Sequence, residues 1–545
     1  MIEKLKKYIK SRGFQKACTV MVILFLIYDF GHIFWESAFP VKKPENNIRQ
    51  TYMIYYGELD DSIIKDARRY DIVILHPDSG NITRQQVEAI QKGGTIVFGY
   101  LSVGEDLRTN GMTPEQMLTD IRFTGDKTGP RVAPENAGLA DLEGNDISGR
   151  TSPGGSGFAS YYLDDNDYDG MPDFNPSFNC AYTNIGDPAW YDELNQMQKD
   201  GTDQVAGIRE ILTEDYGRGL GCDGLFLDTI DTCAPDLFTR DDDPCRTRFE
   251  WTAPGVARFM QRLKEEYPDK YILQNRGLFF YNYYYPHYEY SPRKYIDFLL
   301  FESYMLDSDP ARTYKEDFFA DNKNVYAPKI SAEANRPDGF KVLSLGYAEG
   351  PEELGLKSAL SGNTAAAGFD VLMEDIVQAQ DKAGFSHYIT DGSLTLVNDF
   401  VLEHNEADDI LPPVWSSVHN NSEEYPKQEP VPRTGIGEVE LTEDGIIVRW
   451  DVAVDKSGVI YTLYYQSTPF DFEKDPDLER AQQIELCPET GKGYGYGAAF
   501  ETYPYQSIIK GLDKGVTYYF VIRAKDCSPG NNEEKNTVVK KGSLL

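Results

Sequence analysis

The feature that most constrains this fold is a series of short, almost wholly apolar runs that alternate with amphipathic segments. Such runs, rich in β-branched residues, are typical of strands covered on both faces, as in a parallel sheet. The amphipathic segments between them have the period of helices, and one ends at the helix stop Gly93-Gly94. The six clearest runs are residues 51–57, 71–77, 95–105, 222–231, 270–277 and 296–304.

Repeated strand and helix units over about 350 residues predict a (β/α)8 barrel, which we place at residues 50–405. An open doubly wound sheet is the second choice, although no GxGxxG or Walker sequence supports a nucleotide site. Three segments compete for the last two strands, at 324–330, 340–347 and 367–373. A long insertion, 106–190, follows the third strand and is rich in Gly, Asp, Asn and Pro.

A change of composition near residue 406 predicts a linker over 406–434 and a second domain over 435–545. The second domain has short alternating strands separated by turn residues, the pattern of a β-sandwich. The spacing of Trp450, the YTLYY run and VTYYFVIRAKD resembles a fibronectin type III domain. In that family the tryptophan and the second tyrosine-containing strand form the core, so we assign these residues no catalysis.

The first residues have the composition of an export segment. Residues 1–16 are basic and residues 17–35 are mostly apolar, which predicts a membrane anchor or a signal peptide. The lysines would keep the amino end in the cytoplasm, and the remainder would be exported to the cell surface or secreted. We favour an uncleaved anchor because no good small-x-small cleavage site follows. Export permits disulfides, and we expect Cys233 to pair with Cys245 and Cys487 with Cys527.

Candidate reacting groups stand where the predicted strands end, because barrel enzymes hold their chemistry at the carboxyl ends of the strands. Asp228 ends the fourth run, Asn275 and Arg276 end the fifth, and Glu302 ends the sixth. Glu105 ends the third. Converging carboxylates without a metal motif suit glycoside hydrolysis, which needs a protonated acid and an ionised carboxylate. Glu302 follows FLLF and fits the acid, whereas Asp228 in DTIDT fits the nucleophile or base.

Each of these residues also has a structural explanation. Asp228 could cap the following segment, and Glu302 could pair with Arg276. The aromatic run over 277–291 either stacks on sugar rings at the rim of a cleft or packs over the barrel mouth. The sequence leaves these alternatives open, along with the choice between retention and inversion.

Four segments together resemble the glycoside hydrolase family 114 barrel, namely GELDDSIIKDARRYDIVILHP, GYLSVGE, GCDGLFLDTID and LLFESY. The resemblance spans roughly residues 50–400 apart from the insertion, and the family contains endo-α-1,4-polygalactosaminidases. It implies that Asp228 and Glu302 are the catalytic pair. It also implies that Tyr56, Glu105, Asn275 and Tyr304 lie near the sugar; we add Arg276 from its place at a strand end.

A calcium loop is expected inside the insertion, independently of that resemblance. The spacing D-x-D-x-D-G-x-x-D alternates carboxylates with a glycine for the sharp turn, which suits a Ca²⁺ shell. A solvated acidic turn is the alternative, and the role of the ion would be structural. The proposed ligands are Asp165, Asp167, Asp169 and Asp173.

The sequence therefore predicts an exported glycosidase that needs no catalytic cofactor. Its expected substrate is an α-linked, galactosamine-type polysaccharide, and the net charge of −34 is compatible with such a cationic polymer. The same charge excludes nucleic acid as a partner, since nothing would neutralise phosphates. A non-catalytic carbohydrate-binding protein is one alternative. A structural or adhesive protein that uses its fibronectin-like domain is another.

Overall fold

The structure is a computed structural model of the whole chain. It describes residues 51–79, 82–125, 157–164, 171–236, 238, 247–312, 320–398, 401–402, 404, 409–416, 418, 433–498 and 501–544. The expected basic segment 1–16 and apolar segment 17–35 lie outside these residues. Among the described residues, no helix combines the length and the apolar character needed to cross a membrane.

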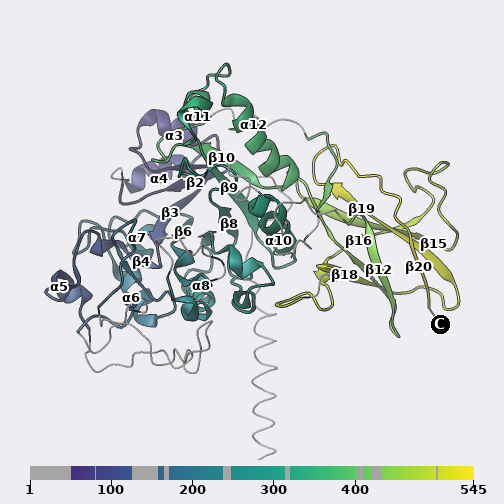
Figure 1. The fold of residues 1–545 in the computed structure, drawn as a ribbon, viewed down its shortest axis with the longest axis horizontal. Coiled ribbons are helices and arrows are strands. Elements are labelled where there is room, and N and C mark those ends of the chain that lie inside the picture. The colour runs from purple at the N-terminus through teal and green to yellow at the C-terminus, as the bar shows by residue number, and fades with distance from the viewer. Residues whose placement is uncertain are drawn as a thin grey trace, which may run out of the picture. The chain divides into compact units, whose positions relative to one another are not determined.

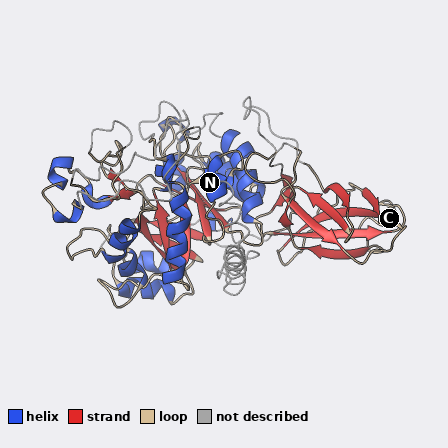
Figure 2. Cartoon of the chain, turned by 90° about the horizontal axis from the view of Figure 1, so that it is seen from below, coloured by secondary structure: helices blue, strands red, loops and turns tan. Residues whose placement is uncertain are grey.

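Eight parallel strands form a nearly closed barrel, which confirms the predicted fold. Figure 2 shows strands of the chain with helices packed around them. Every neighbouring pair in the order β1-β2-β3-β6-β7-β8-β9-β10 is parallel. The strands are β1 (Tyr52–Tyr55), β2 (Ile72–Leu75), β3 (Ile96–Ser102), β6 (Gly224–Asp228), β7 (Tyr271–Asn275), β8 (Phe298–Phe301), β9 (Lys341–Tyr347) and β10 (Ser386–Thr390).

The barrel is joined at its seam through the backbone and through aromatic rings. Tyr56 N–H donates to the carbonyl of Leu394 at 2.8 Å, just beyond the ends of β1 and β10. The ring of Tyr52 lies 5.6 Å from that of Tyr388, and Tyr70 lies 6.0 Å from the same ring. These contacts bring the first and last strands together.

Helices connect the strands (Figure 1). Their large apolar residues are buried or half-buried, as expected for amphipathic helices beside a sheet. They are α3 (Asp61–Ala67), α4 (Arg84–Gln91), α6 (Pro188–Gln196), α7 (Ile208–Leu212), α8 (Pro254–Glu266), α10 (Ala327–Ala334), α11 (Leu356–Leu360) and α12 (Phe369–Val377).

The last two strands differ in part from the three candidates. Residues 340–347 contain β9, but 324–330 and 367–373 are helical, and the eighth strand is β10. The sequence SHYIT of β10 was missed because a buried histidine, His387, interrupts its apolar character. Its side chain is satisfied by Ser344 and Asp375, which the sequence alone does not reveal.

The insertion follows β3, as predicted, and its described part is held against the barrel by hydrogen bonds. It contains α5 (Pro114–Met117) and an antiparallel pair of β4 (Glu105–Asp106) with β5 (Ala181–Tyr182). The carbonyl of Val103 accepts from Trp190 Nε1 at 2.7 Å and from Thr183 Oγ1 at 3.0 Å. These bonds fix the loop that leads from β3 toward Glu105.

The carboxyl-terminal domain is a β-sandwich of two antiparallel four-stranded sheets, as expected. Trp450 is fully buried in its core, with its ring 5.6 Å from Tyr461 and 5.9 Å from Tyr505. The sheets have the order β12-β13-β18-β17 and β16-β15-β19-β20, and β11 pairs with β14. The strands are β11 (Val414–Ser416), β12 (Ile436–Leu441), β13 (Ile446–Trp450), β14 (Val452–Val454), β15 (Val459–Gln466), β16 (Gln482–Leu486), β17 (Glu489–Thr490), β18 (Tyr505–Ile509), β19 (Thr517–Asp526) and β20 (Lys540–Ser543).

Part of the expected linker belongs to this sandwich, since β11 falls within 406–434. The barrel also contributes to the sandwich core. Gly497 N–H donates to the carbonyl of Tyr283 at 2.7 Å, and Arg336 donates to the carbonyl of Pro504 at 3.1 Å. Tyr283, from the aromatic run 277–291, is buried in the core cluster of the sandwich. That run therefore supplies packing, at least through Tyr283.

The expected disulfide between Cys487 and Cys527 is wrong, because both thiols are free. Cys487 is exposed at the edge of the second domain, and Cys527 is half-buried after β19. Cys233 is free and buried, and Cys245 lies outside the described residues.

Candidate active site

Three neighbouring strands each end in a polar residue at the same rim of the barrel. Asp228 closes β6, Asn275 closes β7 and Glu302 directly follows β8. In each case the next residue has a left-handed backbone, with φ of 64° at Thr229, 53° at Arg276 and 56° at Ser303. Non-glycine residues in this region are uncommon and concentrate at functional sites. Turns of this kind end all three strands directly after the polar residue.

The side chain of Asn275 links the two carboxylates. Its Nδ2 donates to Asp228 Oδ1 at 2.8 Å and to Glu302 Oε2 at 2.8 Å. Because both oxygens accept from the same nitrogen, the distance between them cannot exceed twice 2.8 Å. The pair predicted from strand ends is therefore brought together, with an amide between its members.

A tyrosine donates to the remaining oxygen of each carboxylate. Tyr100 in β3 donates to Asp228 Oδ2 at 2.9 Å, and Tyr347 in β9 donates to Glu302 Oε1 at 2.7 Å. Sequence analysis missed both, yet each follows a glycine near the end of a strand. A side chain at Gly99 would meet Ile211 of α7, and one at Gly346 would meet Asp375 of α12. Glycine faces the helix, so the adjacent tyrosine faces the barrel interior.

Burial and the neighbouring charge of Glu302 raise the pKa of Asp228 above its usual value. Hydrogen bonds from Asn275, Thr229 N–H and Tyr100 act in the opposite direction by stabilising the carboxylate. Two half-buried carboxylates that accept from the same amide repel each other when both are ionised, which favours a state with one proton between them. An arrangement with one acid and one anion is what general acid and nucleophile require.

The hydroxyl of Thr229 fastens Asp228 to the loop after β3. Thr229 Oγ1 accepts from Gly104 N–H at 2.7 Å and donates to the carbonyl of Asp228 at 2.6 Å. Val103 N–H approaches the same oxygen at 3.2 Å and also donates to the Asp228 carbonyl at 3.1 Å. A β-branched residue at positive φ is strained, and these bonds hold it there.

Tyr56 and Glu105, both expected near the sugar, lie beside Asp228. The ring of Tyr56 meets His76 edge-on at 4.9 Å and Tyr100 at 5.7 Å, and Asp228 is among the charges that act on its hydroxyl. Glu105 Oε1 accepts from Asn175 of the insertion at 2.7 Å. Burial raises the pKa of Glu105 to about 7, and the charge of Asp228 adds to this rise.

Arg276 is bound by an acidic neighbour, and Tyr304 is placed differently from the expectation. Arg276 Nε donates to Asp231 Oδ2 at 2.6 Å, and Gly277 N–H donates to the other oxygen at 2.9 Å. This ion pair orders the turn directly after Asn275, the last residue of β7. Tyr304 is buried in the core, with its ring 5.1 Å from Phe301. We therefore correct its role from sugar contact to packing.

A line of three residues has the order of a hydrolase triad but is structural. His387 Nδ1 is hydrogen-bonded to Ser344 Oγ at 2.8 Å, and His387 Nε2 is hydrogen-bonded to Asp375 Oδ2 at 2.7 Å. At most 2% of any of the three is exposed, so no polymer reaches them. They attach α12 to β9 and β10.

The predicted calcium loop falls mostly outside the described residues, which include Asp173 but not Asp165, Asp167 or Asp169. It remains a prediction.

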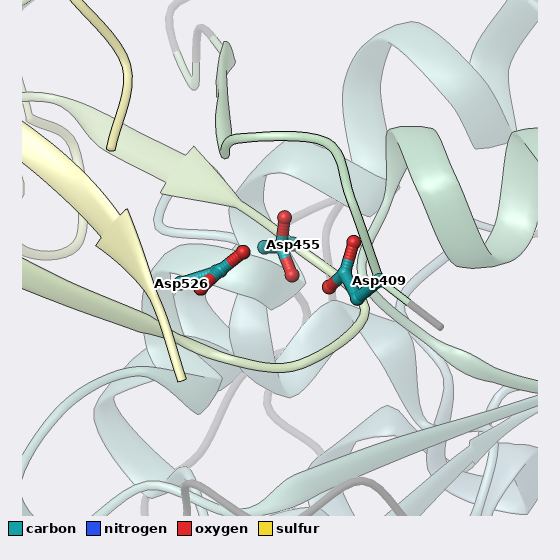
Figure 3. A group of neighbouring side chains, drawn as sticks. All are labelled: Asp409, Asp455 and Asp526. Carbon is teal, nitrogen blue, oxygen red and sulfur yellow. The ribbon is translucent and has the colours of Figure 1, made fainter. Parts of the chain in front are cut away.

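A different group of carboxylates lies in the second domain. Within the described part of the chain, one set of three has oxygens within 4.8 Å of one another (Figure 3). Its members are Asp409, Asp455 and Asp526. Burial, with the charges of Asp409 and Asp526, raises the pKa of Asp455 to about 8. This rise favours the protonated form of Asp455, and Ser457 Oγ donates to Asp409 Oδ2, which joins residue 409 to the turn after β14.

No family model matches the chain. No curated protein matches it either. Among solved structures, the glycoside hydrolase domain of PelA from Pseudomonas aeruginosa is 16% identical, with a TM-score of 0.34 over 64% of this chain and 98% of that one. An α-amylase of Anoxybacillus is 10% identical, with a TM-score of 0.33 over 88% and 98%. Trehalose-6-phosphate hydrolase of Bacillus licheniformis is 14% identical, with a TM-score of 0.31 over 57% and 59%. Values this low carry no conclusion about activity, which must come from the residues of this chain.

Proposed function

We propose that the chain is a glycoside hydrolase that works by the retaining, two-step mechanism. The observation that supports this most is the single amide of Asn275 bound to both Asp228 and Glu302. The limit it sets on the distance between Asp228 Oδ1 and Glu302 Oε2 is close to the ~5–5.5 Å typical of retaining enzymes and below the ~6.5–9.5 Å of inverting ones. The short separation leaves no room for a water between carboxylate and sugar, so the carboxylate itself attacks.

Asp228 is the nucleophile in this mechanism, and Glu302 is the acid and then the base. Asp228 accepts hydrogen bonds from Asn275, from Tyr100 and from Thr229 N–H, and each of them stabilises its carboxylate form, which is the form a nucleophile needs. In the first step, Asp228 attacks the anomeric carbon while Glu302 gives its proton to the departing glycosidic oxygen. In the second, Glu302 takes a proton from water, whose oxygen attacks that carbon and releases Asp228.

The substrate we propose is an α-linked, galactosamine-type polysaccharide met outside the cytoplasmic membrane. The family 114 resemblance supports the sugar, and the basic and apolar first residues support export, by an anchor or a signal peptide. The charges around the site agree with a cationic polymer. Glu105 adds a third acidic group beside the pair, while Arg276 is engaged by Asp231. A cation on the substrate would favour the ionised form of Glu105, so the site and a cationic polymer would attract each other.

Proton NMR during hydrolysis of an α-1,4-galactosamine oligomer tests the mechanism. We expect the first product to appear as the α-anomer and then to equilibrate with the β-anomer. Initial release of the β-anomer would contradict retention while leaving hydrolysis itself intact. Binding of the oligomer without cleavage would instead favour a non-catalytic carbohydrate-binding protein.

A further inference from the structure

The orientation of the Asn275 side chain leaves its own carbonyl oxygen without a hydrogen bond. Both N–H bonds are used on the carboxylates, while Oδ1 is buried and has no hydrogen-bond partner. Turning the amide over would place an acceptor oxygen between two acceptors, so chemistry dictates this orientation. An asparagine present for stability alone would satisfy its oxygen, because buried polar groups are normally bonded. The carboxylate pair therefore determines how this residue sits.

We propose that Asn275 is a positioning residue that keeps one donor group on the negative charge of the site as that charge moves between carboxylates. The inference rests on the proposed retaining mechanism, because only a two-step reaction moves the charge. Before the first step the charge is on Asp228. In the glycosyl-enzyme, Asp228 is an uncharged ester and Glu302 is the anion. Asn275 Nδ2 already contacts both, so neither step requires a new donor to be recruited.

The two tyrosines cannot perform this task. Tyr100 donates to Asp228 and Tyr347 donates to Glu302, and each hydroxyl serves one carboxylate only. Among the described residues, Asn275 is the group that donates to both members of the pair. Sequence analysis placed Asn275 at the sugar, but its donors are occupied. We therefore assign it to the pair.

Other charged and titratable groups also face the pair and remain in place in a variant of Asn275. Their fields act on Asp228 or Glu302 in both proteins, so a comparison of variant with wild type isolates the amide. They are Tyr52 and Tyr56 of the first strand region, Tyr100 of β3, Glu105 of β4, Arg276 after β7 and Tyr347 of β9.

The pH profile of kcat/KM for the full-length protein on an α-1,4-galactosamine polymer tests this role. Its acid and alkaline limbs report the two ionisations of the pair formed by Asp228 and Glu302. Loss of the amide weakens both anions, so in Asn275→Leu both limbs should move to higher pH by about one unit. Asn275→Ala gives the same test if the leucine variant does not fold.

Single-donor variants and a neighbouring amide provide matched controls. Tyr100→Phe and Tyr347→Phe each remove a donor from one carboxylate, so each should move one limb more than the other. Gln274→Met should move neither, because Gln274 bonds to Tyr281 and to the carbonyl of Arg276. If neither limb moves in Asn275→Leu, or if only one limb moves, the proposal that Asn275 serves both carboxylates is overturned. If the wild type cleaves no polymer, it is the proposed function that fails instead.

Discussion

Thr229 offers the sharpest test of how the backbone holds the nucleophile. Thr229→Val preserves the size and the β-branch, and with it the strain at φ 64°, but removes the hydroxyl. Gly104 N–H then loses its 2.7 Å acceptor, whereas Val103 N–H keeps the carbonyl of Asp228. One buried donor left without a partner costs about 1–3 kcal/mol. A shift of the nucleophile by ~1 Å costs about 100-fold in rate.

We therefore expect the free energy of unfolding of Thr229→Val, measured in urea, to be about 2 kcal/mol lower than that of the wild type. We expect its kcat to be about 100-fold lower. KM should change little, because Thr229 acts through Asp228 and not on the sugar. Thr229→Ser restores the hydroxyl and should recover most of both losses. A valine variant with the stability and kcat of the wild type would refute the idea that this hydroxyl positions Asp228.

Three further predictions concern the rest of the chain. The folded state raises the pKa of Asp455 to about 8, above its unfolded value near 4. Its contribution to stability is therefore largest at low pH and is lost as pH rises through 8. Asp455→Asn should show a smaller fall in Tm between pH 5 and 9 than the wild type, and an equal fall would contradict this. Deleting residues 433–545 uncovers Tyr283 and Arg336, so the remaining barrel should melt lower or aggregate in light scattering; an unchanged Tm would show that the sandwich is only a spacer. Calcium should raise Tm in calorimetry through binding to the predicted loop, and Asp167→Ala should abolish the rise.

Much of the barrel follows from local pattern, because its strands are buried on both faces and read as apolar runs. Six strands and the positions of Asp228 and Glu302 at their ends could be predicted this way. Residues 367–373 read equally well as a strand or a helix, and their packing as α12 decides the outcome. Strand β10 was missed because its buried polar group depends on partners far away in sequence.

The site required more than pattern. The bridge made by Asn275 depends on the register of three strands, which sets β7 between β6 and β8. Tyr100 and Tyr347 were not recognised because they lie within apolar runs. The glycine before each tyrosine marks a position where a helix packs closely against the barrel. The left-handed turns after all three strands involve Thr, Arg and Ser, whose propensities give no sign of positive φ. Tertiary hydrogen bonds stabilise these turns.

The release of reducing ends from polysaccharides tests the central claim most directly. The full-length protein would be incubated with α-1,4-galactosamine, N-acetylgalactosamine and neutral polymers, beside Asp228→Asn and Glu302→Gln. We expect release from the galactosamine polymer, abolished by both substitutions while both variants keep the Tm of the wild type within a few degrees. Equal release by either folded variant would contradict the assignment of Asp228 and Glu302 as the catalytic pair.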